Sequence, residues 1–249
     1  MDIQALETIS MHAWPALDEH DYDGWRLRFA NGYTGRSNSV YPLAASTLDL
    51  AEKIAYCEAA YAERGLIPRF KLTPAAQPAE LDRELETRGY KLHTPSQMLT
   101  LDLAHLPPAA PPAAPVRITD EATLSEAWLN AYLRLSGVNP DYHVTVRALL
   151  ERIEPQTIYG AAYADDQICA VTLGVRDGAL IGLFDVVTHA EQRGQGIGTA
   201  LTTHVLQQGQ RSGAQRGYLQ VLGSNATAQR LYARLGYQFS YPYWYRLKA

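Results

Sequence analysis

A strand that leads through a glycine cluster into a helix constrains the fold more than any other feature of this chain. Residues 186–206 read VVTHAEQRGQGIGTALTTHVL, and three glycines fall within five positions, at 194, 196 and 198. Glycine costs roughly 0.5 to 1 kcal/mol in regular structure, so such a cluster indicates a backbone that needs positive φ angles or a close approach to a ligand. Apolar residues then recur every four positions, at Ile197, Leu201 and Val205, which predicts a helix. The junction therefore predicts a fold that mixes strands and helices.

The same loop is suited to binding an anion. The first N–H groups of a helix have no intrahelical partner, and the helix dipole places partial positive charge beside them. A plain tight turn needs only one glycine, so three glycines and an arginine favour a phosphate-binding loop. The dinucleotide fingerprint is excluded because the sixth position from Gly194 is Thr199, and the Gly-Lys-Ser/Thr of an NTPase loop is absent.

A segment rich in proline and alanine divides the chain. Residues 105–115 read HLPPAAPPAAP and hold five of the 14 prolines. Proline can neither continue a helix nor donate to a sheet ladder, so the segment predicts a semi-rigid linker. The predicted domains are therefore residues 1–104 and residues 116–249.

The second half predicts the element order β, α, α, β, β, β, α, β, α, β, β. Asp177 and Gly178 form the strongest hairpin signal in it, between the second and third of three consecutive strands. The predicted strands are 115–120, 156–164, 167–176, 179–188, 217–223, 237–241 and 244–249, and the predicted helices are 121–137, 141–153, the helix after the glycines, and 225–235.

The first half predicts a shorter version of the same order. Its predicted strands are 24–30, 36–41, 67–72 and 90–103, and its predicted helices are 47–64 and 78–89. A helix followed by RGYKL at 88–92 and a helix followed by LGYQF at 235–239 suggest an internal duplication, although two αβ units also converge on such patterns without common descent. Where the long helix of the first half begins, residues 41–50 read YPLAASTLDL and contain no glycine, so the predicted anion site belongs to the second half alone.

Composition narrows the class of partner. The formal charge of -4 and the pI near 6.0, with basic residues scattered along the chain, predict no nucleic-acid partner. No run approaches about 18 apolar residues and the N-terminus has no secretion-signal pattern, so we expect no membrane span and a cytoplasmic location. The only cysteines, Cys57 and Cys169, lie far apart, and no metal-ligand spacing occurs. We therefore expect reduced cysteines and no metal.

With these motifs in place, the second half resembles the GNAT superfamily of acyl-CoA-dependent N-acyltransferases over roughly residues 116–249. The family's signature loop, Arg or Gln, two residues, Gly, one residue, Gly or Ala, corresponds to Arg193, Gly196 and Gly198. A second family feature, near the last helix, is an asparagine, a Leu-Tyr pair and a Gly-aromatic stop, matched by Asn225, Leu231-Tyr232 and Gly236-Tyr237. Ala190 departs from the proline common in the family. The resemblance implies tandem GNAT-like domains, each a twisted, mostly antiparallel sheet flanked by helices, with a degenerate copy in the first half.

The resemblance also implies the site residues. Acetyl-CoA is the implied cosubstrate, and the backbone at the end of the strand before the loop would hold its pantetheine arm and donate to the thioester oxygen. Tyr232 is the implied acid for the departing thiolate. The implied cofactor-binding residues are Val186, Val187, Thr188, Arg193, Gly194, Gln195, Gly196, Ile197, Gly198, Thr199, Asn225 and Tyr232.

The general base is not evident. Some relatives place a glutamate where this sequence has Gln220, and others an acid or a histidine where it has Gly182 and Phe184. Asp185 is the only ionisable side chain on the strand before the loop, and regular alternation would put it on the same face as Val187, so Asp185 is the candidate base. A purely structural aspartate is the alternative.

The expected activity is transfer of an acetyl group from acetyl-CoA to a primary amine of a small molecule or an amino acid. Two alternatives stay open: a protein N-terminal acetyltransferase, and a non-catalytic acyl-CoA sensor or assembly module. His189 and His204 are weaker candidates for a role in catalysis, and the aromatic residues after 236 fit a half-buried closing strand better than an acceptor pocket. We expect a monomer or a homodimer.

Overall fold

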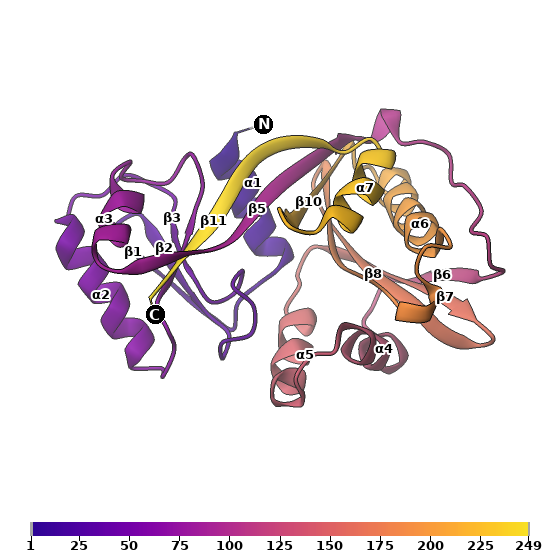
Figure 1. Cartoon of the computed structure of the whole chain (residues 1–249), viewed down its shortest axis with the longest axis horizontal. Helices are drawn as coiled ribbons and strands as arrows, with labels where there is room; N and C mark the ends of the chain where they lie inside the picture. The colour runs from indigo at the N-terminus through magenta and orange to yellow at the C-terminus, as the bar shows by residue number, and fades with distance from the viewer. Residues whose placement is uncertain (1, 249) are drawn as a thin grey trace. The chain divides into compact units, whose positions relative to one another are not determined.

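The computed structural model describes residues 2–248, in two units (Figure 1). Within the described residues, the first unit comprises 2–97, 222–224 and 241–248, and the second comprises 98–221 and 225–240. Two strands, β5 (Tyr90–Asp102) and β11 (Gln238–Lys248), contribute residues to both units. The predicted domain boundaries at residues 104 and 116 stay a prediction.

The first unit has the strand order β1-β2-β3-β4-β11. Neighbouring strands pair antiparallel except β3 and β4, which are parallel and meet at Val40 and Phe70. Besides β5 and β11, its elements are α1 (Ile3–Ala13), β1 (Asp18–Tyr22), β2 (Trp25–Phe29), β3 (Val40–Pro42), α2 (Leu50–Ala62), β4 (Arg69–Leu72) and α3 (Leu81–Thr87).

Alternation along β4 explains how this unit is layered. Phe70 and Leu72 belong to an apolar cluster that includes Ile54 of α2 and Leu85 of α3. Successive side chains of a strand point to opposite faces. Lys71, between them, pairs instead with Glu7 of α1, so α1 covers the other face of the sheet.

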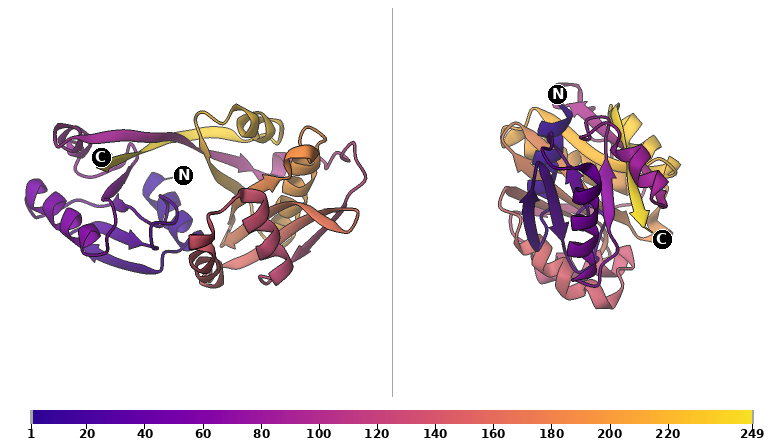
Figure 2. Two further views of the ribbon diagram at one scale, coloured as in Figure 1. Left: turned by 60° about the horizontal axis from the view of Figure 1, so that its bottom comes forward. Right: turned by 90° about the vertical axis from the view of Figure 1, so that its left-hand side faces the viewer.

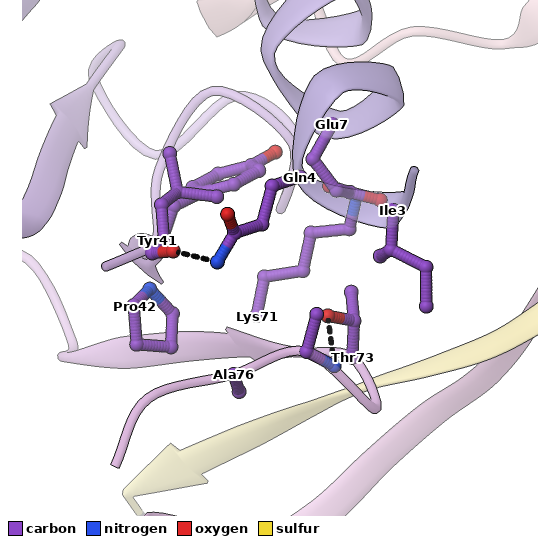
Figure 3. A pocket seen from close by; sticks show the side chains of 10 residues that line it. Ile3, Gln4, Glu7, Tyr41, Pro42, Lys71, Thr73 and Ala76 are labelled. Atoms are coloured by element: carbon purple, nitrogen blue, oxygen red, sulfur yellow. Dashed lines mark hydrogen bonds and ion pairs between the residues drawn. The ribbon is translucent and has the colours of Figure 1, made fainter. Parts of the chain in front are cut away.

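A buried ion pair holds α1 in place. Lys71 Nζ lies 2.5 Å from Glu7 Oε2, and both residues are at most 2% exposed. The hydroxyl of Tyr241 donates to the other carboxylate oxygen at 2.9 Å. Figure 3 shows these two charged side chains in a small pocket between α1 and the ends of β3 and β4. Each charge is compensated here, as burial requires.

The second unit has the strand order β5-β10-β9-β8-β7-β6. The start of β11 also belongs to this unit and lies next to β5, on the side away from β10. The pairs β6/β7, β7/β8 and β8/β9 are antiparallel, and β9/β10 is parallel. Besides β5 and β11, its elements are the 3-10 helix η1 (Leu103–His105), β6 (Arg117–Glu121), α4 (Glu126–Ser136), η2 (Pro140–Tyr142), α5 (His143–Glu151), β7 (Gln156–Ala164), β8 (Gln167–Asp177), β9 (Leu180–Thr188), η3 (Ala190–Gln192), α6 (Ile197–Arg211), β10 (Arg216–Leu222) and α7 (Ala226–Arg234).

Within the second unit, α6 and α7 cover one face of the sheet and α4 and α5 the other (Figure 2). Val205 of α6 packs so closely on β7 that a Cβ at Gly160 would lie 2.6 Å from its Cγ2. On the opposite face, the indole of Trp128 in α4 donates to the carbonyl of Gly160 at 2.9 Å. The glycine therefore lets α6 approach the sheet at the centre of the unit.

The predicted mixed α/β class, with mostly antiparallel sheets flanked by helices, is confirmed, and so is most of the element order. Helix α1 and strand β1 were not predicted. The two closing strands predicted at 237–241 and 244–249 form the single strand β11, as far as the described residues extend. Among residues 2–248, no helix combines the length and apolar character needed to cross a bilayer.

The strand predicted at 36–41 is shorter than expected because Asn38 organises a loop. Its Oδ1 accepts from the N–H groups of Ala30 and Gly32, and its Nδ2 donates to the carbonyls of Tyr33 and Thr34. A side chain that satisfies four backbone groups competes with the sheet ladder. Strand β3 therefore begins only at Val40.

Candidate active site at the end of β9

The parallel strands β9 and β10 stop pairing before either strand ends. Their register runs from Arg216 opposite Leu180 to Leu219 opposite Leu183, while β9 continues to Thr188 and β10 to Leu222. The end of β9 therefore pairs only with β8 on its other edge. Residues 185–188 are half-buried, in contrast to the buried residues 180–184 that precede them.

A β-bulge turns the backbone of β9 where this separation begins. Leu173 of β8 lies opposite Phe184 and Val171 lies opposite Val187, so Asp185 and Val186 both face the single residue Thr172. Asp185 has φ +51°, a left-handed conformation that aspartate tolerates better than most residues. The bulge interrupts the regular alternation from which a common face for Asp185 and Val187 is expected, so that placement stays a prediction.

The glycine loop after η3 presents backbone N–H groups at the start of α6. Gly194 has φ +79° and Gly196, the N-cap of α6, has φ +82° and no side-chain cap hydrogen bond. Within the described part of the chain, the N–H groups of residues 194–199 have no acceptor. Arg193 Nε donates to the carbonyl of Thr188 at 3.1 Å, which ties the loop to the end of β9. This arrangement fits the pyrophosphate of an acyl-CoA.

Gly198 brings three elements of the site together. A Cβ at this position would lie 3.2 Å from Oγ1 of Thr188 on β9 and 3.6 Å from Cδ1 of Leu231 on α7. The first turn of α6 thus lies close to both elements, and a side chain at this position would crowd the hydroxyl of Thr188. Residues 186–188, the glycine loop and α7, which the sequence predicts as parts of one site, are adjacent.

Asn225 lies at the start of α7 and Tyr232 near its end. Asn225 is the N-cap, and its Oδ1 accepts from the N–H of Ala228 at 3.0 Å. Tyr232 is 7% exposed and packs edge-to-face on Tyr237, with ring centroids 5.8 Å apart. Burial raises the pKa of the Tyr232 hydroxyl to about 12, so it carries its proton throughout the neutral range.

Two further ionisable groups, Tyr159 and His204, lie on elements that neighbour the site. Burial raises the pKa of Tyr159 on β7 to about 12, opposed by its hydrogen bond with Thr157 and assisted by the charge of Asp185. His204 Nε2 lies 2.6 Å from Asp120 Oδ1 on β6, so this histidine belongs to the contact between α6 and β6. Nothing in residues 2–248 groups three or more His, Cys, Asp or Glu side chains as a metal would require.

The sequence gives no sign of one contact at this site. The N–H of Ala113, in the proline-rich segment, donates to the carbonyl of Gln195 at 2.9 Å. Pro112 lies against the next residue of the loop, since a Cβ at Gly196 would lie 3.5 Å from its Cα. Composition predicts a connecting segment here, but it cannot predict which surface the segment touches.

Comparisons with known proteins agree with this geometry. Residues 1–246 match the family described as "Probable histone acetyltransferase Rv0428c C-terminal". An uncharacterized N-acetyltransferase, YobR of Bacillus subtilis (strain 168), is 28% identical over 250 residues, with 99% of each chain covered. A GCN5-related N-acetyltransferase from Kribbella flavida has a similar structure, with a TM-score of 0.74, 17% identity, and coverage of 100% of this chain and 96% of that chain.

A two-domain relative is also similar in fold. A tandem GNAT protein from the clavulanic acid biosynthesis pathway has a TM-score of 0.62 and 13% identity, with 97% of this chain and 87% of that chain covered. At such identities the structural likeness shows the fold, and the activity of this chain is argued from its own site.

Proposed function

We propose that this chain, which belongs to the family described as Rv0428c C-terminal acetyltransferases and is an N-acetyltransferase of the GNAT type, transfers an acetyl group from acetyl-CoA to a primary amine. The acceptor we favour is a small molecule or an amino acid. The expected cytoplasmic location and the expected monomer or homodimer stay proposals beside it.

One observation carries the choice of donor. The N–H groups of residues 194–199 lack acceptors directly beside a strand end that is paired on one edge only. A pyrophosphate would satisfy the N–H groups of the loop, and an extended amide-bearing arm would satisfy the strand edge of β9. Acetyl-CoA carries both groups next to each other, because its pantetheine arm is joined directly to the pyrophosphate.

In the proposed reaction, acetyl-CoA supplies the acetyl group as a thioester. The backbone of Val186, Val187 and Thr188 would hold the pantetheine arm and donate to the carbonyl oxygen, where negative charge develops. The bulge at Asp185 gives this backbone a direction that a regular strand would not. Arg193, Gly194, Gln195, Gly196, Ile197, Gly198 and Thr199 would hold the pyrophosphate, with Asn225 at the start of α7.

Tyr232 is the proposed acid for the departing thiolate. The pKa of about 12 exceeds the roughly 8.5 of a thiol in water, which disfavours the transfer if only the tyrosine is perturbed. A thiolate in the same buried surroundings is also destabilised, so its pKa rises as well and the mismatch shrinks. Asp185 is the proposed base. Because it lies in the bulge, it has a second candidate role, which is to hold the left-handed backbone conformation there.

The test is thiol release from acetyl-CoA in the presence of a panel of amines. The panel holds amino acids, small polyamines and a lysine-rich peptide, the last because the family description names a histone acetyltransferase. Thiol release that depends on one of these acceptors supports the proposal. The proposal would be contradicted if no acceptor in the panel caused thiol release and acetyl-CoA did not bind.

Gly196→Glu places a carboxylate at the N-cap of α6 and should abolish acetyl-CoA binding in calorimetry. Gly213→Glu is the matched control, because Gly213 follows the other end of α6 and also has a positive φ, +105°. The control carries comparable backbone strain and the same charge but lies away from the loop. Loss of binding in both variants would mean that strain, rather than the loop, explains the effect.

A further inference from the structure

The proline-rich segment does more than connect two parts of the chain. Within the second unit it runs beside α6 (Figure 1). Its residues 112 and 113 touch the glycine loop. The N–H of Ala113 donates to the carbonyl of Gln195 at 2.9 Å, and Pro112 lies in van der Waals reach of Gly196.

That hydrogen bond fixes one peptide plane at the centre of the loop. The carbonyl of Gln195 and the N–H of Gly196 belong to the same peptide, and in a trans peptide they point in opposite directions. A carbonyl directed at Ala113 therefore directs the N–H of Gly196 to the opposite side of the loop. That N–H is one of those without an acceptor in the described chain.

The loop needs such external support. Gly194 and Gly196, on either side of Gln195, both have positive φ angles, and no side chain caps α6. Glycine loses more conformational freedom on ordering than any other residue. A free loop would pay that entropy when its ligand binds, whereas a loop already held in place would not.

The segment is well suited to hold a loop because it is itself stiff. Residues 111, 112 and 115 are prolines, which fix φ and cannot donate, so Ala113 and Ala114 supply the only N–H groups between them. A donor on a stiff segment is placed with little further loss of entropy.

We infer that Ala113 is a positioning residue for the pyrophosphate of the donor, acting through Gln195 to aim the N–H of Gly196. The inference rests on the proposed function. The segment then contributes to the choice of donor. Acetyl-CoA, which carries a pyrophosphate, is preferred over S-acetylpantetheine, which lacks one.

Ala113→Pro tests this inference because it removes the N–H of residue 113 while the segment stays rich in proline and alanine. Ala109→Pro, in an exposed part of the same segment, is the matched control. With Ala113→Pro we expect the Kd of acetyl-CoA to rise about 2- to 12-fold, the usual effect of one lost hydrogen bond. The KM of S-acetylpantetheine should match the wild type, and Ala109→Pro should change neither.

Three results would overturn the inference: unchanged affinity for acetyl-CoA in Ala113→Pro, equal weakening toward both donors, or the same weakening in Ala109→Pro. If Ala113→Pro does not fold, Pro112→Gly loosens the segment while keeping the donor, and it should weaken acetyl-CoA alone. Failure of the proposed function looks different, since the wild type would then bind no acetyl-CoA.

Discussion

The backbone N–H of Thr47 donates a hydrogen bond to the carboxylate of Asp23, at 2.9 Å to Oδ2. The N–H of Leu48 donates to the same oxygen at 2.9 Å, and Lys53 Nζ lies 3.3 Å from it. Thr47 and Leu48 lie in the loop before α2, at the place where the second unit has its glycine loop. In the first unit, carboxylates of the protein itself thus accept from the N–H groups here, because Asp23 binds those of Thr47 and Leu48 and Asp49, the N-cap of α2, binds those of Ala51 and Glu52.

The strand end beside this loop is also filled. Strands β3 and β4 are parallel and pair only at Val40 and Phe70, as β9 and β10 pair over a limited length. Beyond that point the side-chain amide of Gln4 in α1 donates to the carbonyl of Leu43 (Figure 3). The first unit therefore satisfies with its own side chains backbone groups of the loop before α2 and of the chain just after β3.

We expect one molecule of acetyl-CoA to bind per chain. The second unit offers the N–H groups of its glycine loop, whereas in the first unit Asp23 and Asp49 already accept from N–H groups before α2 and in its first turn. Titration calorimetry should give a stoichiometry of about one for the wild type. Gly196→Glu should reduce it to zero, and a site that survives in this variant would show that the first unit also binds.

Asp23 should stabilise the first unit in a pH-dependent way. The N–H of Leu48, together with the Thr47 groups and Lys53, lowers the pKa of the Asp23 carboxyl from 3.8 to about 2. A carboxyl whose pKa is lower in the folded state contributes stability above its unfolded pKa and loses it as pH falls through the folded value. The difference in Tm between wild type and Asp23→Asn should therefore be full at pH 7 and shrink between about pH 4 and pH 2.

Thermal melts across this range measure the effect. Asp166→Asn is the control, since Asp166 lies on the corresponding turn between β7 and β8 and its side chain is fully exposed. Its Tm should follow the wild type at every pH. A difference for Asp23→Asn that persists unchanged down to pH 2 would contradict the role of the charge.

The features that the sequence predicts are those carried by local patterns. The glycine cluster, the helix with Leu201 and Val205, and the Asp177-Gly178 hairpin are short-range signals, and each lies where predicted. Strand β1 has the sequence DEHDY, which shows no alternation of apolar and polar residues. Its residues are exposed or half-buried, so the fold does not require apolar side chains there. Helix α1 depends on the distant residue Lys71 for its buried contact. Such long-range pairings leave no periodic signal.

The site shows the same division. The loop can be read from spacing, but the bulge at Asp185 depends on how β8 and β9 pair, and the contact of Ala113 with Gln195 joins residues far apart in sequence. Asp23 gives no sequence signal of its role either, since an Asp-Gly turn predicts only a hairpin.

Asp185 should prove sensitive to the shape of its side chain as well as to its charge. A left-handed conformation costs a β-branched residue roughly 1 to 3 kcal/mol, whereas asparagine tolerates it nearly as well as aspartate. Asp185→Val should therefore lower the Tm clearly, and Asp185→Asn should leave it nearly unchanged. If the carboxylate is the base, turnover of Asp185→Asn falls by roughly 10² to 10⁴ fold. Wild-type turnover in this variant would leave Asp185 only its backbone role.

Tyr232→Phe separates a proton donor from a packed ring. The ring contacts Tyr237 and lies in the apolar core of the second unit, and phenylalanine keeps that packing, so the Tm should barely change. If the hydroxyl protonates the leaving thiolate, turnover should fall by roughly 10 to 10⁴ fold while the affinity for acetyl-CoA stays within a few fold. Tyr237→Phe is the matched control, because its buried hydroxyl has no hydrogen-bond partner among the described residues. Steady-state kinetics and a thermal melt of both variants distinguish the two roles. Equal turnover in the two variants would remove Tyr232 from the mechanism. A large loss of Tm in Tyr232→Phe would assign its hydroxyl to the stability of the core.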